Sequence, residues 1–170
     1  MNVTLADARA TPRGRAALRR LFPLYVHDLS PHTAFYRMDE RGRWRPDLFR
    51  EWVSLPTIDA YLIYADRGLA GFAIVGHRPF PHMSRDRDHK LCEFFVLAAH
   101  RRSGVGLAAA SAVFDRHPGS WELTILPTNT VAIAFWRAML ARYASGRQEE
   151  VQLPNDTIVW FESRARVLAR

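Results

Sequence analysis

The chain has 170 residues, 48% of them hydrophobic and 24% charged, which is typical of an ordinary folded domain. We expect one domain over residues 1–170, and the single Cys92 excludes an intramolecular disulfide and a zinc cluster built from cysteines. No apolar run approaches the roughly 20 residues that span a bilayer, and the N-terminus lacks the basic start and apolar core of a signal peptide. The expectation is a cytoplasmic protein with no membrane partner.

The net charge of +7 raises the question of nucleic-acid binding. All but one of the 24 basic residues are Arg, however, and they are spread along the chain with acidic residues among them. No basic run carries interleaved aromatic residues, and no helix-turn-helix or zinc-finger spacing is present. We therefore expect a solvated basic surface and no nucleic-acid partner.

The first half of the chain is predicted to open with a short strand over Val3–Ala6, followed by a long helix. Thr11 can cap that helix with Pro12 at its first position, and apolar residues then recur at helical spacing. Ser30-Pro31 ends the helix because the residue before a proline disfavours helical backbone. The elements expected next are an irregular stretch over 31–50, a short helix over 47–53, and strands over 60–65 and 70–76 joined by a hairpin turn at 66–69.

The second half of the chain alternates strands and helices, starting from a near-continuous apolar run. The expected elements are a loop over 78–90, a strand over 91–97, a helix ending near 117, a strand over 121–125, a helix around 131–139, and a hairpin of 148–153 with 157–161. Consecutive strands without crossover helices imply antiparallel pairing, whereas the strand–helix–strand unit from Leu91 to Leu126 implies one parallel or splayed pair. We therefore predict a mixed α/β fold, with a mostly antiparallel central sheet flanked by helices.

A basic glycine turn, His100–Gly106, separates the apolar strand from an alanine-rich helix. The start of a helix presents unpaired backbone N–H groups and the positive end of a dipole, and glycine lets a ligand approach that backbone. The turn therefore predicts a phosphate or pyrophosphate site. Leu107-Ala108 stands where a P-loop has Lys-Ser/Thr, which disfavours a nucleoside triphosphate, and the missing third glycine disfavours a dinucleotide.

Two motifs follow one another in this half of the chain. They are Arg101-x-x-Gly104-x-Gly106 after the apolar strand, and Asn129-x-x-Ala132-x-x-Phe135-Trp136 in the helix after the next strand. Together they resemble the GNAT superfamily of N-acetyltransferases, most firmly over residues 91–139. The resemblance implies the acyl-CoA N-acyltransferase fold and one N-acetyltransferase domain. It also implies transfer of an acetyl group from acetyl-CoA to a primary amine, directly and within a ternary complex.

The resemblance also implies which residues bind the coenzyme. The pyrophosphate would be held by the turn, the pantetheine arm by the strand edge, and the channel wall would come from the second motif. These residues are Arg101, Arg102, Ser103, Gly104, Val105 and Gly106 in the turn, Phe95, Val96 and Leu97 on the strand, and Asn129, Phe135 and Trp136 on the later helix. The backbone N–H of Val96 would stabilise the oxyanion that develops on the thioester carbonyl.

Glu93 is the candidate catalytic base. It is an acid in an otherwise apolar strand, where desolvation would raise its pKa toward neutrality and suit it to accept a proton from an amine. Many members of the resembled family carry a Glu on this strand. The alternative is that Glu93 pairs with an Arg or faces solvent. Strand alternation places Cys92 on the opposite face, where it is expected to be part of the core.

Trp136 departs from the pattern of the resembled family, in which this position is often a Tyr that can protonate the leaving thiolate. The indole N–H is only a hydrogen-bond donor and has no usable acid function. Trp136 is therefore expected to pack against the coenzyme rather than to act as an acid. The departure keeps open a second function, that of a catalytically silent acyl-CoA-binding module for sensing or interaction.

The acceptor amine is expected to enter opposite the coenzyme, between the first helices and the last hairpin. Candidate residues are Tyr25, Asp28 and Tyr36, although Asp28 could equally form an ion pair near the end of its helix. The spacing of the loop histidines His77, His82 and His89 matches no metal site, so we expect solvated imidazoles and no metal. The identity of the amine, the preferred acyl chain and the formation of a homodimer remain open.

Overall fold

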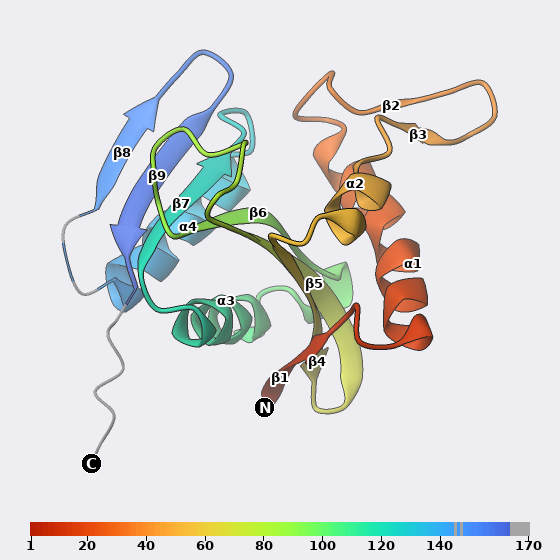
Figure 1. Ribbon diagram of the computed structural model, residues 1–170, viewed down its shortest axis with the longest axis horizontal. Coiled ribbons are helices and arrows are strands. Elements are labelled where there is room, and N and C mark those ends of the chain that lie inside the picture. The colour runs from red at the N-terminus through yellow and green to blue at the C-terminus, as the bar shows by residue number, and fades with distance from the viewer. Residues whose placement is uncertain (145, 147, 164–170) are drawn as a thin grey trace.

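The computed structural model describes residues 1–144, 146 and 148–163 and has the predicted mixed α/β fold. Seven strands form one sheet in the order β1-β4-β5-β6-β7-β9-β8 (Figure 1). All neighbouring strands pair antiparallel except β6 and β7, which are parallel. The strands are β1 (Val3–Asp7), β4 (Ile58–Ala65), β5 (Gly68–His77), β6 (His89–Val96), β7 (Ser120–Ile125), β8 (Glu149–Gln152) and β9 (Thr157–Glu162).

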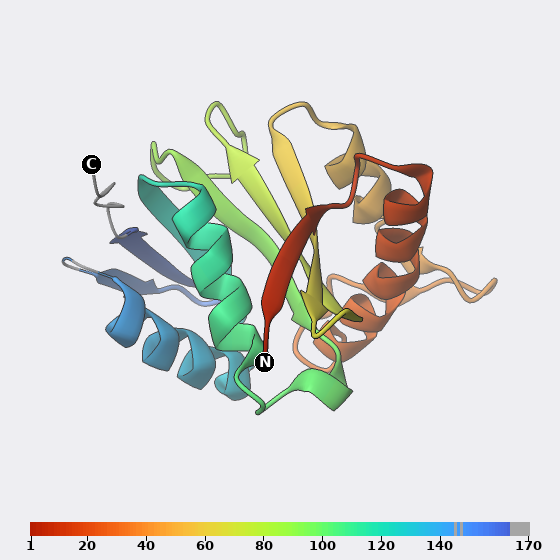
Figure 2. The same ribbon diagram turned by 90° about the horizontal axis from the view of Figure 1, so that it is seen from below.

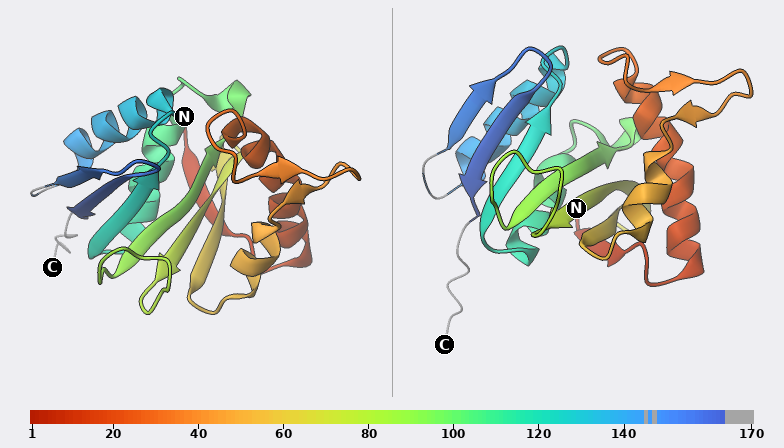
Figure 3. Two further views of the ribbon diagram at one scale, coloured as in Figure 1. Left: turned by 90° about the horizontal axis from the view of Figure 1, so that it is seen from above. Right: turned by 45° about the horizontal axis from the view of Figure 1, so that its top comes forward.

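In the described part of the chain, four α-helices cover the two faces of this sheet. They are α1 (Pro12–Leu29), α2 (Leu48–Ser54), α3 (Val105–Arg116) and α4 (Thr130–Tyr143), and a short 3₁₀ helix, η1 (Ala98–His100), precedes α3. Helices α1 and α2 lie on one face, whereas α3 and α4 lie on the other (Figure 2). Both views of Figure 3 show α1 and α2 on the opposite side of β6 from β7, β9, β8 and α4. The arrangement buries a separate hydrophobic cluster on each face.

The start of α1 follows the predicted capping pattern. The Thr11 hydroxyl accepts the backbone N–H of Gly14 at 3.0 Å, and Pro12 occupies the first helical position. The stretch after this helix is less irregular than expected, because β2 (Arg37–Met38) and β3 (Trp44–Arg45) form a small two-stranded ladder. The Asp39 carboxylate stabilises the intervening turn by accepting the backbone N–H groups of Arg41 and Arg43. None of the helices in the described part of the chain is long and apolar enough to cross a membrane.

Strands β6 and β7 diverge soon after they meet. Their pairing covers three positions, from His89 opposite Trp121 to Leu91 opposite Leu123, although β6 continues to Val96. This is the parallel, splayed pair that the strand–helix–strand unit predicts. The second half of β6 therefore has a backbone edge that β7 does not cover.

A β-bulge interrupts β6 at Cys92. Glu93 pairs with Ile74 on β5 and Leu91 pairs with Val75, so Cys92 is the extra residue. As a result, Cys92 packs against the same cluster as Trp52, the residue that hydrogen-bonds Glu93. The prediction that strand alternation places Cys92 and Glu93 on opposite faces is therefore wrong, because the bulge breaks the alternation at this residue.

Candidate functional site

The glycine turn lies where β6 ends and α3 begins, as predicted. Gly104 is the N-cap of α3 with a φ of 87°, a left-handed conformation that favours glycine, and no side chain caps the helix there. Arg102 also has a positive φ, of 58°. The first N–H groups of α3 and the positive end of its dipole are therefore directed at this turn, which suits an anion.

The uncovered edge of β6 adjoins this turn. The backbone N–H of Leu97 donates to Ala70 O at 2.8 Å, so Leu97 and Ala70 form a hydrogen-bonded antiparallel pair with β5. Because hydrogen-bonded and non-hydrogen-bonded pairs alternate, Val96 opposite Gly71 directs its N–H away from β5, toward the gap between β6 and β7. The N–H of Val96 therefore lies on the edge that an extended ligand could pair with.

Aromatic side chains form the wall of this gap. The Phe94 ring stacks with Phe135 at a centroid distance of 6.2 Å and meets Trp136 edge-on at 5.2 Å. A Cβ placed on Gly106 would lie 3.2 Å from the Phe135 ring, so the first turn of α3 packs closely against α4. Trp136 is 8% exposed and belongs to the core cluster, so most of its ring packs against protein side chains.

Asn129 is the N-cap of α4. Its side-chain oxygen accepts the backbone N–H of Ala132 at 3.0 Å, which leaves its amide NH₂ as the donor for any ligand. Tyr143, at the end of the same helix, is 2% exposed and donates to Asp115 at 2.7 Å. Its hydroxyl proton is thus used in a hydrogen bond to Asp115, on the α3/α4 side of the sheet.

Arg101 and Asp28 form an ion pair across the end of β6. The Arg101 Nε also donates to Val96 O at 2.8 Å, so this guanidinium covers the carbonyl at the free edge. Asp28 therefore takes the ion-pair alternative, and its carboxylate positions Arg101. Both side chains are 40% or more exposed, so this pair contributes little to stability.

Glu93 lies at the centre of a buried network on the α1/α2 face. It is 7% exposed, accepts the Trp52 Nε1–H at 3.0 Å, and accepts a short hydrogen bond from the Tyr25 hydroxyl. Burial raises the pKa of Glu93 to about 7, opposed by these two hydrogen bonds and by the charge of Lys90. Within the described part of the chain, Glu93 forms no ion pair with an arginine, so its pKa stays near neutrality.

Two tyrosines face this carboxylate. Burial and then the charge of Glu93 raise the pKa of Tyr25 and of Tyr36 well above the ordinary value. Both hydroxyls therefore stay protonated at neutral pH and can act only as hydrogen-bond donors and acceptors. Two of the three acceptor-side candidates thus lie beside Glu93.

A pocket of about 610 Å³ opens next to the network, between the segment around α2 and the β8–β9 hairpin. This is the region in which the acceptor was expected. Its walls are mostly aromatic and apolar, with two charged residues, Lys90 and Asp156, among them. The lining includes Phe35, Leu48, Trp52, Phe80, His82, Met83, Lys90, Cys92 and Asp156.

A second buried carboxylate, Glu122 on β7, has no counterpart in the sequence predictions. It is fully buried and bonded to Lys90 Nζ at 2.8 Å, to Trp160 Nε1 at 2.9 Å and to Ser84. Burial favours its neutral form, but these donors and the Lys90 charge hold the pKa of Glu122 below its ordinary value. Strand alternation in the sequence places Glu122 only on the polar face of a half-buried strand. No nearby residue in the sequence indicates which side chains contact it. Trp52 was missed for the same reason, since its contact with Glu93 spans 41 residues.

Residues 20–140 match the model of the Acetyltransferase (GNAT) family. No curated protein matches the chain.

The chain is also similar to solved structures. An acetyltransferase from Thermus thermophilus is 20% identical, with 95% of this chain and 96% of that chain covered and a TM-score of 0.62. A structure from Corynebacterium glutamicum described as "histone acetyltransferase HPA2 and related acetyltransferase" is 12% identical, with 99% and 100% covered and a TM-score of 0.71. Arabidopsis thaliana NAA60 in complex with acetyl-CoA is 15% identical, with 96% and 100% covered and a TM-score of 0.55. Because the family model covers most of the chain, from α1 through α4, the chain belongs to the Acetyltransferase (GNAT) family.

Proposed function

We propose that this protein is an acetyl-CoA-dependent N-acetyltransferase that acetylates a primary amine by direct transfer within a ternary complex. The observation that carries the proposal is the position of Glu93. A buried carboxylate with a pKa of about 7 lies on β6, three residues before the free N–H of Val96. A base and an oxyanion donor on one strand, beside an anion-binding turn, are the groups that acyl transfer to an amine requires.

Acetyl-CoA would bind along the uncovered edge of β6. The backbone N–H groups from Arg102 to Gly106 would hold the pyrophosphate, and Phe95–Leu97 would pair with the pantetheine arm. Phe135 and Trp136 would pack against that arm, and the Asn129 amide would donate to it. Arg101, which already covers Val96 O, would add positive charge beside the turn.

The chemistry would begin with a proton transfer from the acceptor ammonium to the Glu93 carboxylate, directly or through one water. The free amine would attack the thioester carbonyl, so that a C–N bond forms, and the Val96 N–H would stabilise the oxyanion. Collapse breaks the C–S bond and expels the CoA thiolate, and the N-protonated amide that remains loses its second proton to water. Trp136 cannot protonate this thiolate, so the thiolate would leave as the anion and take its proton from water. Glu93 then returns its proton to solvent.

The pocket beside Glu93 supports an acceptor amine attached to an aromatic or apolar group, because the walls are mostly of that kind. Tyr25 would position the Glu93 carboxylate through its hydrogen bond. Tyr36 would contact the acceptor near the amine. Asp28 would act through Arg101 rather than on the amine.

Calorimetry with acetyl-CoA and CoA tests the donor half of this proposal. Ser103 is exposed in the glycine turn, so Ser103→Glu places a carboxylate where the pyrophosphate would lie, and Ser103→Gln is its uncharged control. We expect wild type to bind both ligands, Ser103→Glu to weaken binding about tenfold or more, and Ser103→Gln to change it less than about threefold. Absence of binding to wild type would reject the proposal.

Turnover assays test the second half of the proposal, the transfer of the acetyl group to an amine. With acetyl-CoA and a panel of aromatic and aliphatic primary amines, we expect release of free CoA thiol and acetylated amine in equal amounts. Binding of acetyl-CoA without acetylation of any amine would instead favour the silent acyl-CoA-binding module, which the absence of a tyrosine at position 136 makes the second candidate.

A further inference from the structure

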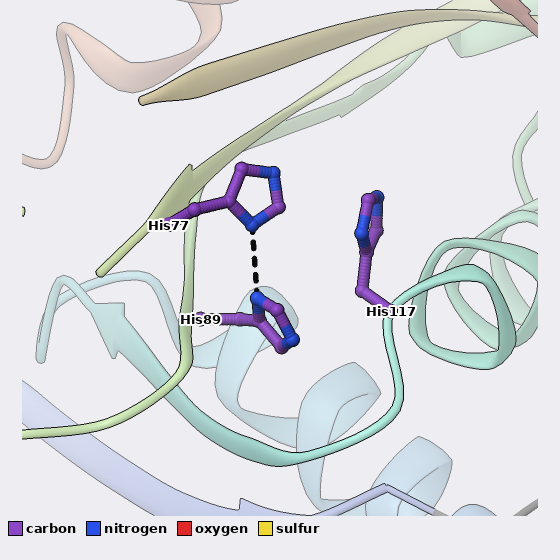
Figure 4. A group of neighbouring side chains, drawn as sticks. All are labelled: His77, His89 and His117. Atoms are coloured by element: carbon purple, nitrogen blue, oxygen red, sulfur yellow. Dashed lines mark hydrogen bonds between the residues drawn. The ribbon is translucent and has the colours of Figure 1, made fainter. Parts of the chain in front are cut away.

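Three histidines meet at the end of the sheet opposite the glycine turn. His77 ends β5, His89 begins β6, and His117 follows the last turn of α3. Each ring offers one nitrogen, and the three nitrogens lie within 4.8 Å of one another (Figure 4). The candidate coenzyme site lies at the other ends of β6 and α3, so this His77–His89–His117 cluster is a separate site. The expectation of solvated loop imidazoles is wrong for His77 and His89, because both lie on strands and are partly buried.

The outer nitrogen of each ring already has a hydrogen-bond acceptor. His77 Nε2 lies 3.0 Å from Asp59 Oδ2, and His89 Nε2 lies 3.3 Å from Pro118 O. The Tyr61 hydroxyl gives its one proton to Asp59, so its oxygen is left to accept from His117 Nε2 at 2.8 Å. The Asp59 carboxylate and the Pro118 carbonyl can only accept, and the Tyr61 oxygen accepts because its proton goes to Asp59. This places the ring proton on Nε2 in all three histidines.

This tautomer leaves the Nδ1 lone pairs on the inside of the cluster. His77 Nδ1 and His89 Nδ1 face each other at 2.9 Å, where two lone pairs repel unless a proton or a cation lies between them (Figure 4). A single proton can be shared by only two nitrogens, whereas a metal ion can bind all three.

We propose that His77, His89 and His117 bind one divalent transition metal ion, with Zn²⁺ the preferred ion. Imidazole nitrogens suit Zn²⁺, and three protein ligands leave a fourth position for water. Asp59 and Pro118 orient two of the rings from outside, an arrangement common around zinc-bound histidines. Tetrahedral Zn–N bonds of about 2.0–2.1 Å imply nitrogens roughly 3.3 Å apart, so the rings need to move by no more than about 1.5 Å.

The ion would tie three elements together. It would join the end of β5, the start of β6 and the C-terminal end of α3, next to the short region in which β6 pairs with β7. The side chains of His77 and His117 are 24% and 14% exposed, so the ion could enter from solvent. The proposal does not depend on the acetyltransferase activity, because none of its ligands lies in the coenzyme or acceptor site.

Calorimetry and thermal unfolding test the site on the full chain, without a histidine tag and after treatment with a chelator. We expect one Zn²⁺ per chain, and a rise in Tm of roughly 5–10 °C when free Zn²⁺ is a hundredfold above its Kd. Co²⁺ in place of Zn²⁺ should give the visible absorption of a four-coordinate ion.

Variants show whether these side chains bind the ion. His89→Asn and His117→Asn should each weaken Zn²⁺ binding by about 100-fold or more, and Asp59→Asn by about tenfold. His27→Asn changes an exposed histidine outside the cluster and should leave the affinity unchanged. If a ligand variant fails to fold, the effect of Zn²⁺ on the Tm of wild type still decides the question.

Two results would overturn the proposal. One is the absence of Zn²⁺ binding to wild type with no change in Tm, which would mean that a shared proton bridges His77 and His89. The other is equal Zn²⁺ affinity in wild type and in both ligand variants, which would place the ion elsewhere. Acetylation is not measured, so failure here leaves the proposed function intact.

Discussion

Glu93 and Glu122 are both buried carboxylates on neighbouring strands, yet their pKa values move in opposite directions. Glu93 is 7% exposed and its pKa rises to about 7, whereas Glu122 is fully buried and its pKa falls below the ordinary value. The two regions differ in their partners. Tyr25 and Trp52 offer Glu93 two neutral donors, but Glu122 contacts the Lys90 ammonium at 2.8 Å. Burial alone therefore does not make a base, because a contacting cation turns the same residue type into a structural anion.

The largest expected difference between the two regions is in catalysis. Glu93→Gln removes the proposed base and should lower kcat by about 10² to 10⁴-fold, with little change in the Kd for acetyl-CoA. Glu122→Gln should keep most of the activity in the fraction that remains folded. Steady-state release of CoA thiol, together with calorimetry for acetyl-CoA, measures both.

The reverse pattern of activities in the two variants would contradict this comparison. If Glu93→Gln turned over like wild type while Glu122→Gln did not, Glu122 would be the functional acid. The same kinetic series run from pH 5.5 to 8.5 adds a second check. The rate of wild type should rise with pH and level off above about pH 7, as Glu93 loses its proton.

The second-largest expected effect is on stability. Here the substitution of Glu122, rather than that of Glu93, should have the larger effect. Glu122→Gln leaves the largely buried Lys90 ammonium without its counter-charge, and breaking a buried ion pair in this way costs about 3–5 kcal/mol of unfolding free energy. Urea unfolding at pH 7 measures the loss. The double variant Glu122→Gln with Lys90→Met removes both charges and should recover part of it.

The smallest effect is the pH dependence that Glu93 adds to stability. Its pKa is raised in the folded state, from 4.5 to about 7, so the folded state binds the extra proton between these values. The stabilisation that this proton provides is complete below about pH 4.5 and is lost as pH rises through 7. The loss amounts to about 3 kcal/mol at 1.36 kcal/mol per pKa unit.

Glu93→Gln should abolish this contribution. The unfolding free energy of wild type, relative to that of Glu93→Gln, should fall by about 3 kcal/mol between pH 4.5 and 8, as measured by urea unfolding at each pH. A constant difference across this range would mean that the two neutral donors hold the Glu93 pKa near its ordinary value.

Local sequence patterns predicted most of the fold. Thr11 and Pro12 marked the start of α1, strand and helix periodicity predicted most of the strands and helices in their order along the chain, and the strand–helix–strand unit predicted the splayed β6–β7 pair. The glycine turn and the Asn129 to Trp136 motif were recognisable for the same reason. Helix caps, turns and amphipathic faces depend on residues a few positions apart, which a single sequence displays directly.

The interactions that distinguish the sites were not visible in this way. Burial raises the pKa of Glu93 against a hydrogen bond from Trp52, 41 residues away, and the pKa of Glu122 is held down by Lys90, 32 residues away. The bulge at Cys92 reversed the face that alternation predicts. His117 joins His77 and His89 only because α3 ends beside the point at which β5 ends and β6 begins.

The sequence by itself thus determined the family and the type of fold, because caps, periodicity and the two motifs are local properties. Only the tertiary structure decided the protonation of the buried acids and the convergence of the histidines. The pKa of a group depends on its desolvation and on the charges within a few ångströms, and those neighbours come from distant parts of the chain.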